Sequence, residues 1–339
     1  MLEQFQAELK WPVFGHTRQV KLIQQAIKAH NLPHGYLIYG LRGLGKKYLS
    51  RLIAASFFCT HAVRPCMICT ACLAVGKKNH PGLTWLPSEQ GDIGIDEIRN
   101  TIRQTRLISA TADSYKLIVL DKAETMTAEA ANALLKILEE PPKNTLFILL
   151  AENINYLPST VISRCQLLKL HPLTNEEMLS WMKEQKVAEH NQQIVLNLAM
   201  GRPGRALKFL QDDLSDYHQR MASNLVLFDR SVQKRFDQLD SRLKSIKTAD
   251  SAISQRNEIT EDFSHDVEYC EAILRDALLF RIDPSLIINV DYQKNVSELA
   301  WRLSVEQIGN ILASLNKLRK EQTEGLNLRL VWENFLLAI

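Results

Sequence analysis

A chain of 339 residues, 46% of them hydrophobic, is long enough for two or three domains that each have a core. Its 41 basic and 38 acidic residues give a net charge of +3, so overall charge does not argue for nucleic-acid binding, which would need a local patch. No apolar run reaches the roughly 18–20 residues that cross a bilayer, and the N-terminal segment does not resemble a signal peptide. We therefore expect a cytoplasmic protein with no membrane contact.

The first half of the chain alternates between short apolar runs and segments with helical spacing. We predict strands over residues 35–39, 117–120 and 146–151. We predict helices over residues 19–30, 47–58, 95–102 and 127–140. Thr127 can cap the last of these helices, and Pro141 ends it. Strands that are wholly apolar and separated by helices indicate a parallel sheet with helices on both faces.

The strand pattern stops at about residue 170. Residues 171–210 are predicted to form a small helical unit, and residues 211–339 read as long amphipathic helices throughout. We therefore expect an α/β domain over residues 1–170, followed by two helical parts.

The strongest short motif is the segment 40–47, GLRGLGKK, which follows a predicted strand and precedes a predicted helix. A phosphate-binding loop requires this context. Its glycines allow backbone N–H groups to converge on phosphate oxygens; they are Gly40, Gly43 and Gly45. Lys46 would reach the terminal phosphates of a nucleotide. The alternative interpretation is a chance glycine turn.

Two positions depart from what ATP hydrolysis requires. A working loop has Ser or Thr after the lysine because the hydroxyl binds Mg²⁺, but Lys47 stands there, and its ammonium group would repel a cation. Asp121 ends an apolar strand, which is the Walker B pattern for an aspartate that holds Mg²⁺ through water. The next residue in hydrolysing proteins is a glutamate, whereas here it is Lys122. Together these departures argue against hydrolysis.

Four of the six cysteines fall within fourteen residues, in the pattern C-x6-C-x2-C-x2-C; they are Cys59, Cys66, Cys69 and Cys72. Four thiolates satisfy a tetrahedral Zn²⁺ ion and leave no position for water, so the spacing predicts a structural zinc site. A set of buried free thiols is the alternative. Cys165 and Cys270 stand alone and are expected to be ordinary core residues.

These segments together resemble bacterial clamp-loader AAA+ subunits, the family of the delta-prime and gamma/tau subunits of DNA polymerase III. The resemblance covers residues 11–210 and continues more weakly at 274–276 and 327–335. Its most specific part is the stretch 132–142, NALLKILEEPP, together with the triplet Ser163-Arg164-Cys165. From spacing alone, that triplet is only a polar turn after a strand over residues 157–162.

The resemblance implies roles that spacing does not supply. The Ser-Arg-Cys triplet matches the arginine-finger motif, so Arg164 is expected to project into the ATP site of a neighbouring subunit. Arg205 matches the sensor-2 arginine, and the sensor-1 position falls on Glu152 or Asn153 instead of the usual Thr. The same resemblance makes residues 171–210 a helical lid and residues 211–339 an all-α collar through which subunits assemble.

Gamma/tau subunits keep the Ser or Thr of the loop and the Asp-Glu pair, whereas this chain keeps only the finger. The resemblance therefore implies a delta-prime-type subunit, a component of the DNA polymerase III holoenzyme that is not itself catalytic. Its implied partners are the gamma/tau and delta subunits, the sliding clamp and primed DNA. Its implied ligands are a structural Zn²⁺ and an ATP or ADP that can bind but is not hydrolysed.

Two other functions stay open at this point. One is an active clamp-loader ATPase of the gamma/tau type, which turnover by the pure protein would reveal. The other is a zinc-dependent DNA-binding module with a vestigial nucleotide fold, which would need basic and aromatic residues near the cysteines. Residues 59–78 carry Arg64, Lys77 and Lys78 but no Tyr or Trp or Phe, which disfavours stacking on bases.

Overall fold

The computed structural model describes residues 8–29, 31–86, 93–109, 115–211, 214–246, 252–323 and 327–339. The chain divides into two compact units, Met1–Leu207 and Lys208–Ile339. Among the described residues, no helix has the length and apolar character needed to span a bilayer.

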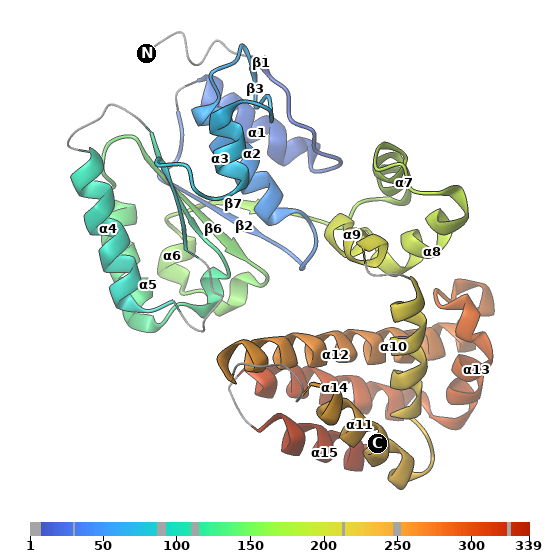
Figure 1. Cartoon of the computed structure of the whole chain (residues 1–339). Helices are drawn as coiled ribbons and strands as arrows, with labels where there is room; N and C mark the ends of the chain where they lie inside the picture. The colour runs from blue at the N-terminus through green and yellow to red at the C-terminus, as the bar shows by residue number, and fades with distance from the viewer. Residues whose placement is uncertain are drawn as a thin grey trace. The chain divides into compact units, whose positions relative to one another are not determined.

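A five-stranded parallel sheet forms the centre of the first unit (Figure 1), and its strands pair in the order β4-β5-β6-β2-β7. The strands are β2 (Gly35–Tyr39), β4 (Leu83–Leu86), β5 (Lys116–Leu120), β6 (Thr145–Ala151) and β7 (Gln166–Lys169). In register, Tyr39 at the end of β2 pairs with Ala151 at the end of β6, and the N–H of Gly40 donates to the carbonyl of Ala151 at 3.2 Å. The carboxyl ends of β2 and β6 therefore meet at one edge.

Helices cover both faces of the sheet, as predicted (Figure 1). One face carries α1 (Thr17–Lys28), α2 (Lys46–Phe58) and α3 (Thr70–Gly76). The other carries α4 (Ile95–Ser109), α5 (Ala128–Glu139) and α6 (Ser159–Ile162). Alternate residues of one strand divide between the two cores: Ile148 packs with the first set of helices and Leu149 with the second. The Thr127 side chain caps α5 by accepting a hydrogen bond from the N–H of Ala130.

The prediction of a strand over residues 157–162 is wrong. Residues Ser159–Ile162 form the short helix α6, and the strand β7 begins only after the Ser-Arg-Cys triplet. Pro158 stands at the N-terminus of α6 with φ −58°, a position where proline's missing N–H costs no hydrogen bond. A short apolar run does not by itself distinguish a strand from a helical turn.

Three helices follow the sheet: α7 (Asn175–Glu184), α8 (Glu189–Ala199) and α9 (Pro203–Gln211). Thr174 and Glu177 form a reciprocal capping box at the start of α7. The turn between α8 and α9 has Met200 and Gly201 in left-handed conformations, and a β-carbon on Gly201 would lie 2.4 Å from the carbonyl oxygen of Leu173.

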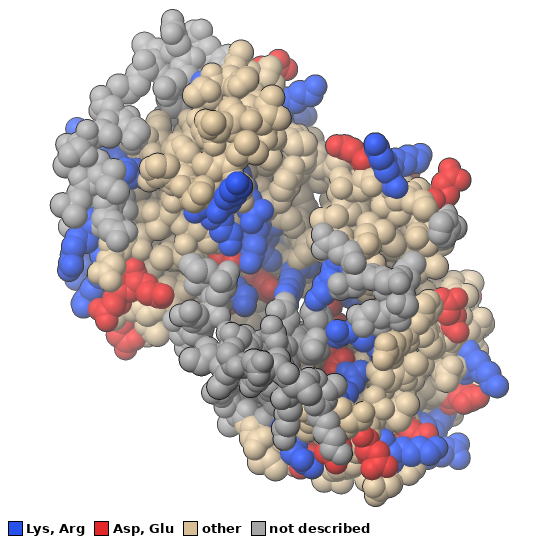
Figure 2. Space-filling view, in the orientation of Figure 1, with Lys and Arg blue, Asp and Glu red and all other residues tan. Residues whose placement is uncertain are grey.

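The described residues of the second unit contain helices and no strand, which confirms the predicted helical C-terminal part. Its helices are α10 (Leu214–Val226), α11 (Val232–Ile246), α12 (Ala252–Ile282), α13 (Gln293–Arg302), α14 (Val305–Thr323) and α15 (Leu328–Ala338). Acidic and basic side chains lie interspersed on the face of this unit drawn in Figure 2.

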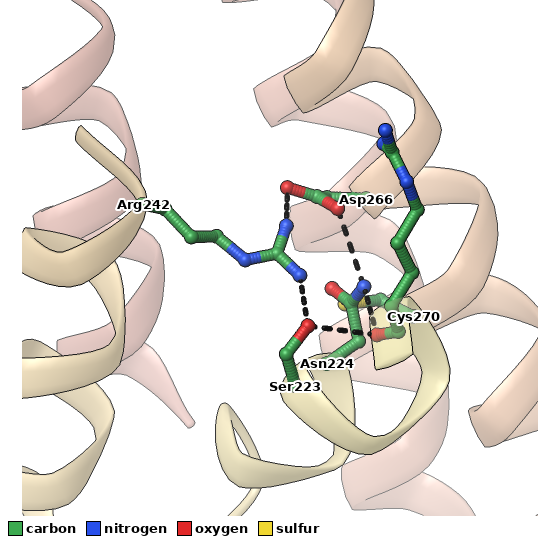
Figure 3. A network of polar contacts seen from close by, with 6 residues as sticks. Ser223, Asn224, Arg242, Asp266 and Cys270 are labelled. Atoms are coloured by element: carbon green, nitrogen blue, oxygen red, sulfur yellow. Dashed lines mark hydrogen bonds and ion pairs between the residues drawn. The ribbon is translucent and has the colours of Figure 1, made fainter. Parts of the chain in front are cut away.

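A buried polar network joins three helices of this unit (Figure 3). Arg242 of α11 forms an ion pair with Asp266 of α12 and donates to the hydroxyl of Ser223 on α10 at 2.5 Å. The side-chain N–H of Asn224 donates to Asp266 at 3.2 Å, and the thiol of Cys270 lies 3.6 Å from Asn224 Oδ1. The Asp266 side chain is only 4% exposed, so its charge depends on these partners.

We expect Arg242→Ala to destabilise the protein by about 3–5 kcal/mol, because it leaves the buried carboxylate of Asp266 without its cation. Urea unfolding followed by circular dichroism measures the change. Arg329→Ala is the control, since Arg329 is 53% exposed and its ion pairs with Asp240 and Glu333 lie at the surface, where such pairs matter little. Equal effects of the two substitutions would contradict this account.

Candidate functional site

The glycine-rich loop connects the end of β2 to the start of α2 and has the backbone that a phosphate-binding loop needs. Gly40, Gly43 and Gly45 all have positive φ angles, of 143°, 86° and 92°. A β-carbon on Gly40 would lie 2.6 Å from the carbonyl oxygen of Leu170, so a side chain there would clash. The ammonium group of Lys46 donates to the carbonyls of Gly40 and Leu41, at 2.5 and 3.0 Å, and therefore lies over the loop.

The start of α9 packs directly against this loop. The N–H of Gly204 donates to the carbonyl of Gly43 at 2.8 Å. A β-carbon on Gly204 would lie 3.0 Å from the Cα of Gly43, and one on Gly43 would lie 3.2 Å from the backbone nitrogen of Arg205. The contact brings the backbone of Arg205, the expected sensor-2 residue, to the loop. The sequence pattern did not predict a role for Gly204, because the pattern does not show that this residue contacts the backbone of Gly43.

Lys47 and Lys122, the two lysines that stand where hydrolysis requires other residues, lie in different environments. The ammonium group of Lys47 forms an ion pair with Asp121, with 2.5 Å between Nζ and Oδ2. The Asp121 side chain is 9% exposed and the Lys47 side chain 55%, so the lysine reaches a largely buried carboxylate from solvent. Lys122 is exposed and has a left-handed backbone with φ 53°. The ammonium of Lys47 thus binds the carboxylate expected to hold Mg²⁺.

Two more carboxylates lie at this edge of the sheet. Glu124 Oε1 accepts a hydrogen bond of 2.8 Å from the N–H of Glu152, which follows β6. Burial raises the pKa of Glu124 above its usual range, and the hydrogen bond from Glu152 opposes this shift. Burial also lowers the pKa of Lys46, whereas the negative charges of Glu152, Glu124 and Asp121 act to raise it.

The sensor-1 position holds no Thr side chain. Glu152 is exposed, and the side chain of Asn153 accepts from the N–H of Asn155 at 3.0 Å, which caps a short helix. The residues expected to bind nucleotide thus come together around the loop, but neither candidate for sensor 1 has a hydroxyl group.

Arg164 lies in the turn between α6 and β7, away from the glycine loop in sequence and on the surface. Its side chain is 36% exposed, donates to the carbonyl of Thr160 at 3.0 Å and forms an ion pair with Glu139. Glu139 is the last residue of α5 and belongs to the conspicuous LEEPP stretch. Sequence reasoning missed this pair, because both residues read as independent surface charges.

One further side chain reaches the loop without a signal in the sequence. His16 Nε2 lies 3.3 Å from the carbonyl oxygen of Leu44, and burial lowers the pKa of this histidine.

The four clustered cysteines meet between α2 and α3. Their sulfur atoms all lie within 4.8 Å of one another, and the pairs Cys66–Cys72 and Cys59–Cys69 are 4.0 Å apart. Tetrahedral zinc with bonds of about 2.3 Å places its sulfurs about 3.8 Å apart, so the cluster fits the ion. The N–H of Cys69 donates to Cys66 Sγ at 3.3 Å, and the N–H of Cys72 donates to Cys69 Sγ at 3.4 Å. These donors stabilise thiolates, and the four residues could hold a metal ion.

We expect purified protein to contain about one Zn²⁺ per chain, measured by inductively coupled plasma mass spectrometry, because four thiolates at this spacing form a closed site. Cys69→Ser should lose most of the metal. Cys165→Ala is the matched control and should keep it, since Cys165 lies outside the cluster. A Cys69→Ser protein with full zinc content would contradict the prediction.

Two family models match the chain. The model described as DNA polymerase III, delta subunit, matches residues 15–174, and the model described as DNA polymerase III, delta subunit, C terminal, matches residues 234–339. The first includes the glycine loop, the cysteine cluster and Arg164.

Curated relatives are named as subunits of DNA polymerase III. The chain is 27% identical over 324 residues to DNA polymerase III subunit delta' of Escherichia coli (strain K12), covering 93% of this chain and 90% of the relative. It is 35% identical over 183 residues to subunit delta' of Bacillus subtilis (strain 168), covering 53% of this chain and 55% of the relative. It is 27% identical over 326 residues to subunit tau of the same organism, covering 91% of this chain and 57% of the relative. The chain thus spans less than two thirds of these two Bacillus relatives. By its two matched models and its relatives, which are named delta', gamma and tau subunits of DNA polymerase III, this chain belongs to the clamp-loader family.

Proposed function

We propose that this chain is a delta-prime-type clamp-loader subunit, which donates Arg164 to an ATP held by a neighbouring gamma/tau subunit and does not hydrolyse ATP itself. The observation that carries the proposal is the ion pair between Lys47 and Asp121. It puts a cation on the carboxylate that a hydrolytic site reserves for Mg²⁺. Lys122 adds a second cation where hydrolysis needs a carboxylate.

The placement of Arg164 supports a role outside its own site. The guanidinium group is part of an exposed turn, and its partner Glu139 is 49% exposed, so another negatively charged group can replace that partner at little cost. Arginine suits the task because its planar, permanently charged fork binds phosphate oxygens through two hydrogen bonds.

The proposed partners follow from the relatives and from the helical second unit. We place the chain in an assembly with gamma/tau and delta subunits, held through residues 211–339 as a collar. In this proposal residues 1–170 are the nucleotide-binding-type domain, residues 171–210 the lid, and Cys59, Cys66, Cys69 and Cys72 hold a structural Zn²⁺. The assembly acts on the sliding clamp and primed DNA.

Arg164→Ala should lower ATP hydrolysis at the neighbouring site by on the order of 10³–10⁵-fold, since a finger stabilises charge that develops in the transition state. DNA-stimulated ATPase of the reconstituted complex measures the effect, and gel filtration measures assembly. Arg18→Ala is the matched control, because Arg18 is another exposed arginine of the same unit. The finger role is wrong if the Arg164→Ala complex assembles and hydrolyses ATP like the wild type.

The second candidate is an active ATPase of the gamma/tau type. The match to subunit tau over 91% of this chain favours it. The charges at Lys47 and Lys122 oppose it, because neither can bind Mg²⁺ or polarise water.

The purified chain should show negligible ATP turnover with Mg²⁺ in a coupled steady-state assay, because both catalytic positions hold lysine. Lys46→Ala is the control for contaminating ATPases. The substitution removes the loop lysine of this chain, whereas turnover by a contaminating ATPase would remain. Clear turnover that Lys46→Ala abolishes would favour the second candidate.

A further inference from the structure

Lys47 is the counter-ion of Asp121, a carboxylate that is largely buried although the lysine itself is more than half exposed. The carboxylate is largely buried at the end of β5, and the ammonium reaches it at 2.5 Å from the first turn of α2. Mg²⁺ needs oxygen ligands at about 2.0–2.1 Å in near-octahedral geometry. Here the loop hydroxyl is missing, and a positive group occupies the approach to the carboxylate. The residues present do not fit Mg²⁺.

We propose that the Lys47 ammonium group takes the place of Mg²⁺ at this site, so that the glycine loop binds a nucleoside diphosphate or triphosphate without a metal. The inference deepens the proposed function and rests on its assignment of the loop as a non-hydrolytic nucleotide site.

The charges around the loop explain why a cation is needed. The Lys46 ammonium group lies in the field of four other charges: the ammonium group of Lys47 and the carboxylates of Asp121, Glu124 and Glu152. Without Lys47, Lys46 would face these three carboxylates without the second ammonium group, and a bound triphosphate would add more negative charge. In hydrolytic relatives of this loop a divalent ion supplies the missing positive charge. Lys47 supplies it here as part of the chain.

The loop retains what phosphate binding requires. Its glycines keep the positive φ angles, Lys46 lies over it, and the backbone of Arg205 is brought to it by the contact between Gly204 and Gly43. Backbone N–H groups of such a loop and basic side chains can bind phosphate oxygens without a metal.

The test is binding of ADP to the full-length, purified chain by isothermal titration calorimetry, once in buffer freed of divalent cations before the protein is added and once with Mg²⁺. No chelator is used, because a chelator would also remove zinc from the cysteine cluster. For the wild type, we expect dissociation constants that agree within about twofold in the two buffers. For Lys47→Thr, which restores the metal-binding hydroxyl, we expect ADP to bind at least about tenfold more tightly with Mg²⁺ than without it. Such a tenfold ratio corresponds to about 1.4 kcal/mol.

Two variants control the experiment. Lys47→Arg keeps the positive charge and should keep binding independent of Mg²⁺, whereas Lys46→Ala should abolish binding in both buffers. Lys47 is more than half exposed, so its substitutions should fold, which circular dichroism verifies. The proposal is overturned if the wild type binds no ADP, or if its dependence on Mg²⁺ equals that of Lys47→Thr. The ADP titration measures binding to the isolated chain, whereas the Arg164→Ala assay measures hydrolysis by the reconstituted complex. Failure of one test can therefore be told apart from failure of the other.

Discussion

Parallel pairing of β2, β5 and β6 is the constraint on which the candidate site depends. Parallel strands end on the same side of a sheet, so the residues that follow them converge even though they are far apart in the chain. Gly40 follows β2, Asp121 follows β5 and Glu152 follows β6. The buried apolar strands between the two helical layers hold these ends in register.

Backbone and side chains at this edge point in different directions. The positive φ angles of Gly40, Gly43 and Gly45 and the aligned strand ends suit a phosphate-binding loop. The side chains of Lys47 and Lys122 do not suit Mg²⁺ binding. Backbone geometry is shared by the whole fold and is costly to alter, whereas an exposed side chain can change with little effect on stability.

Much of this could be predicted from the sequence, because the relevant signals are local. The strand over residues 35–39, the glycine loop and the clustering of the four cysteines each follow from spacing within a short segment. The pairs Lys47–Asp121 and Glu139–Arg164 could not be predicted, since each joins distant segments whose approach is set by packing. The strand predicted over residues 157–162 is a short helix instead. A short apolar run does not distinguish the two, and Pro158 favours the start of a helix.

The contact between Gly43 and Gly204 has a mechanical consequence. With no side chain on either residue, two main chains touch through a 2.8 Å hydrogen bond, and no flexible group lies between them to absorb displacement. A side chain on Gly204 would lie 3.0 Å from the Cα of Gly43, and one on Gly43 would lie 3.2 Å from the backbone nitrogen of Arg205. Any larger residue at either position would therefore crowd the other main chain and press the loop and the first turn of α9 apart.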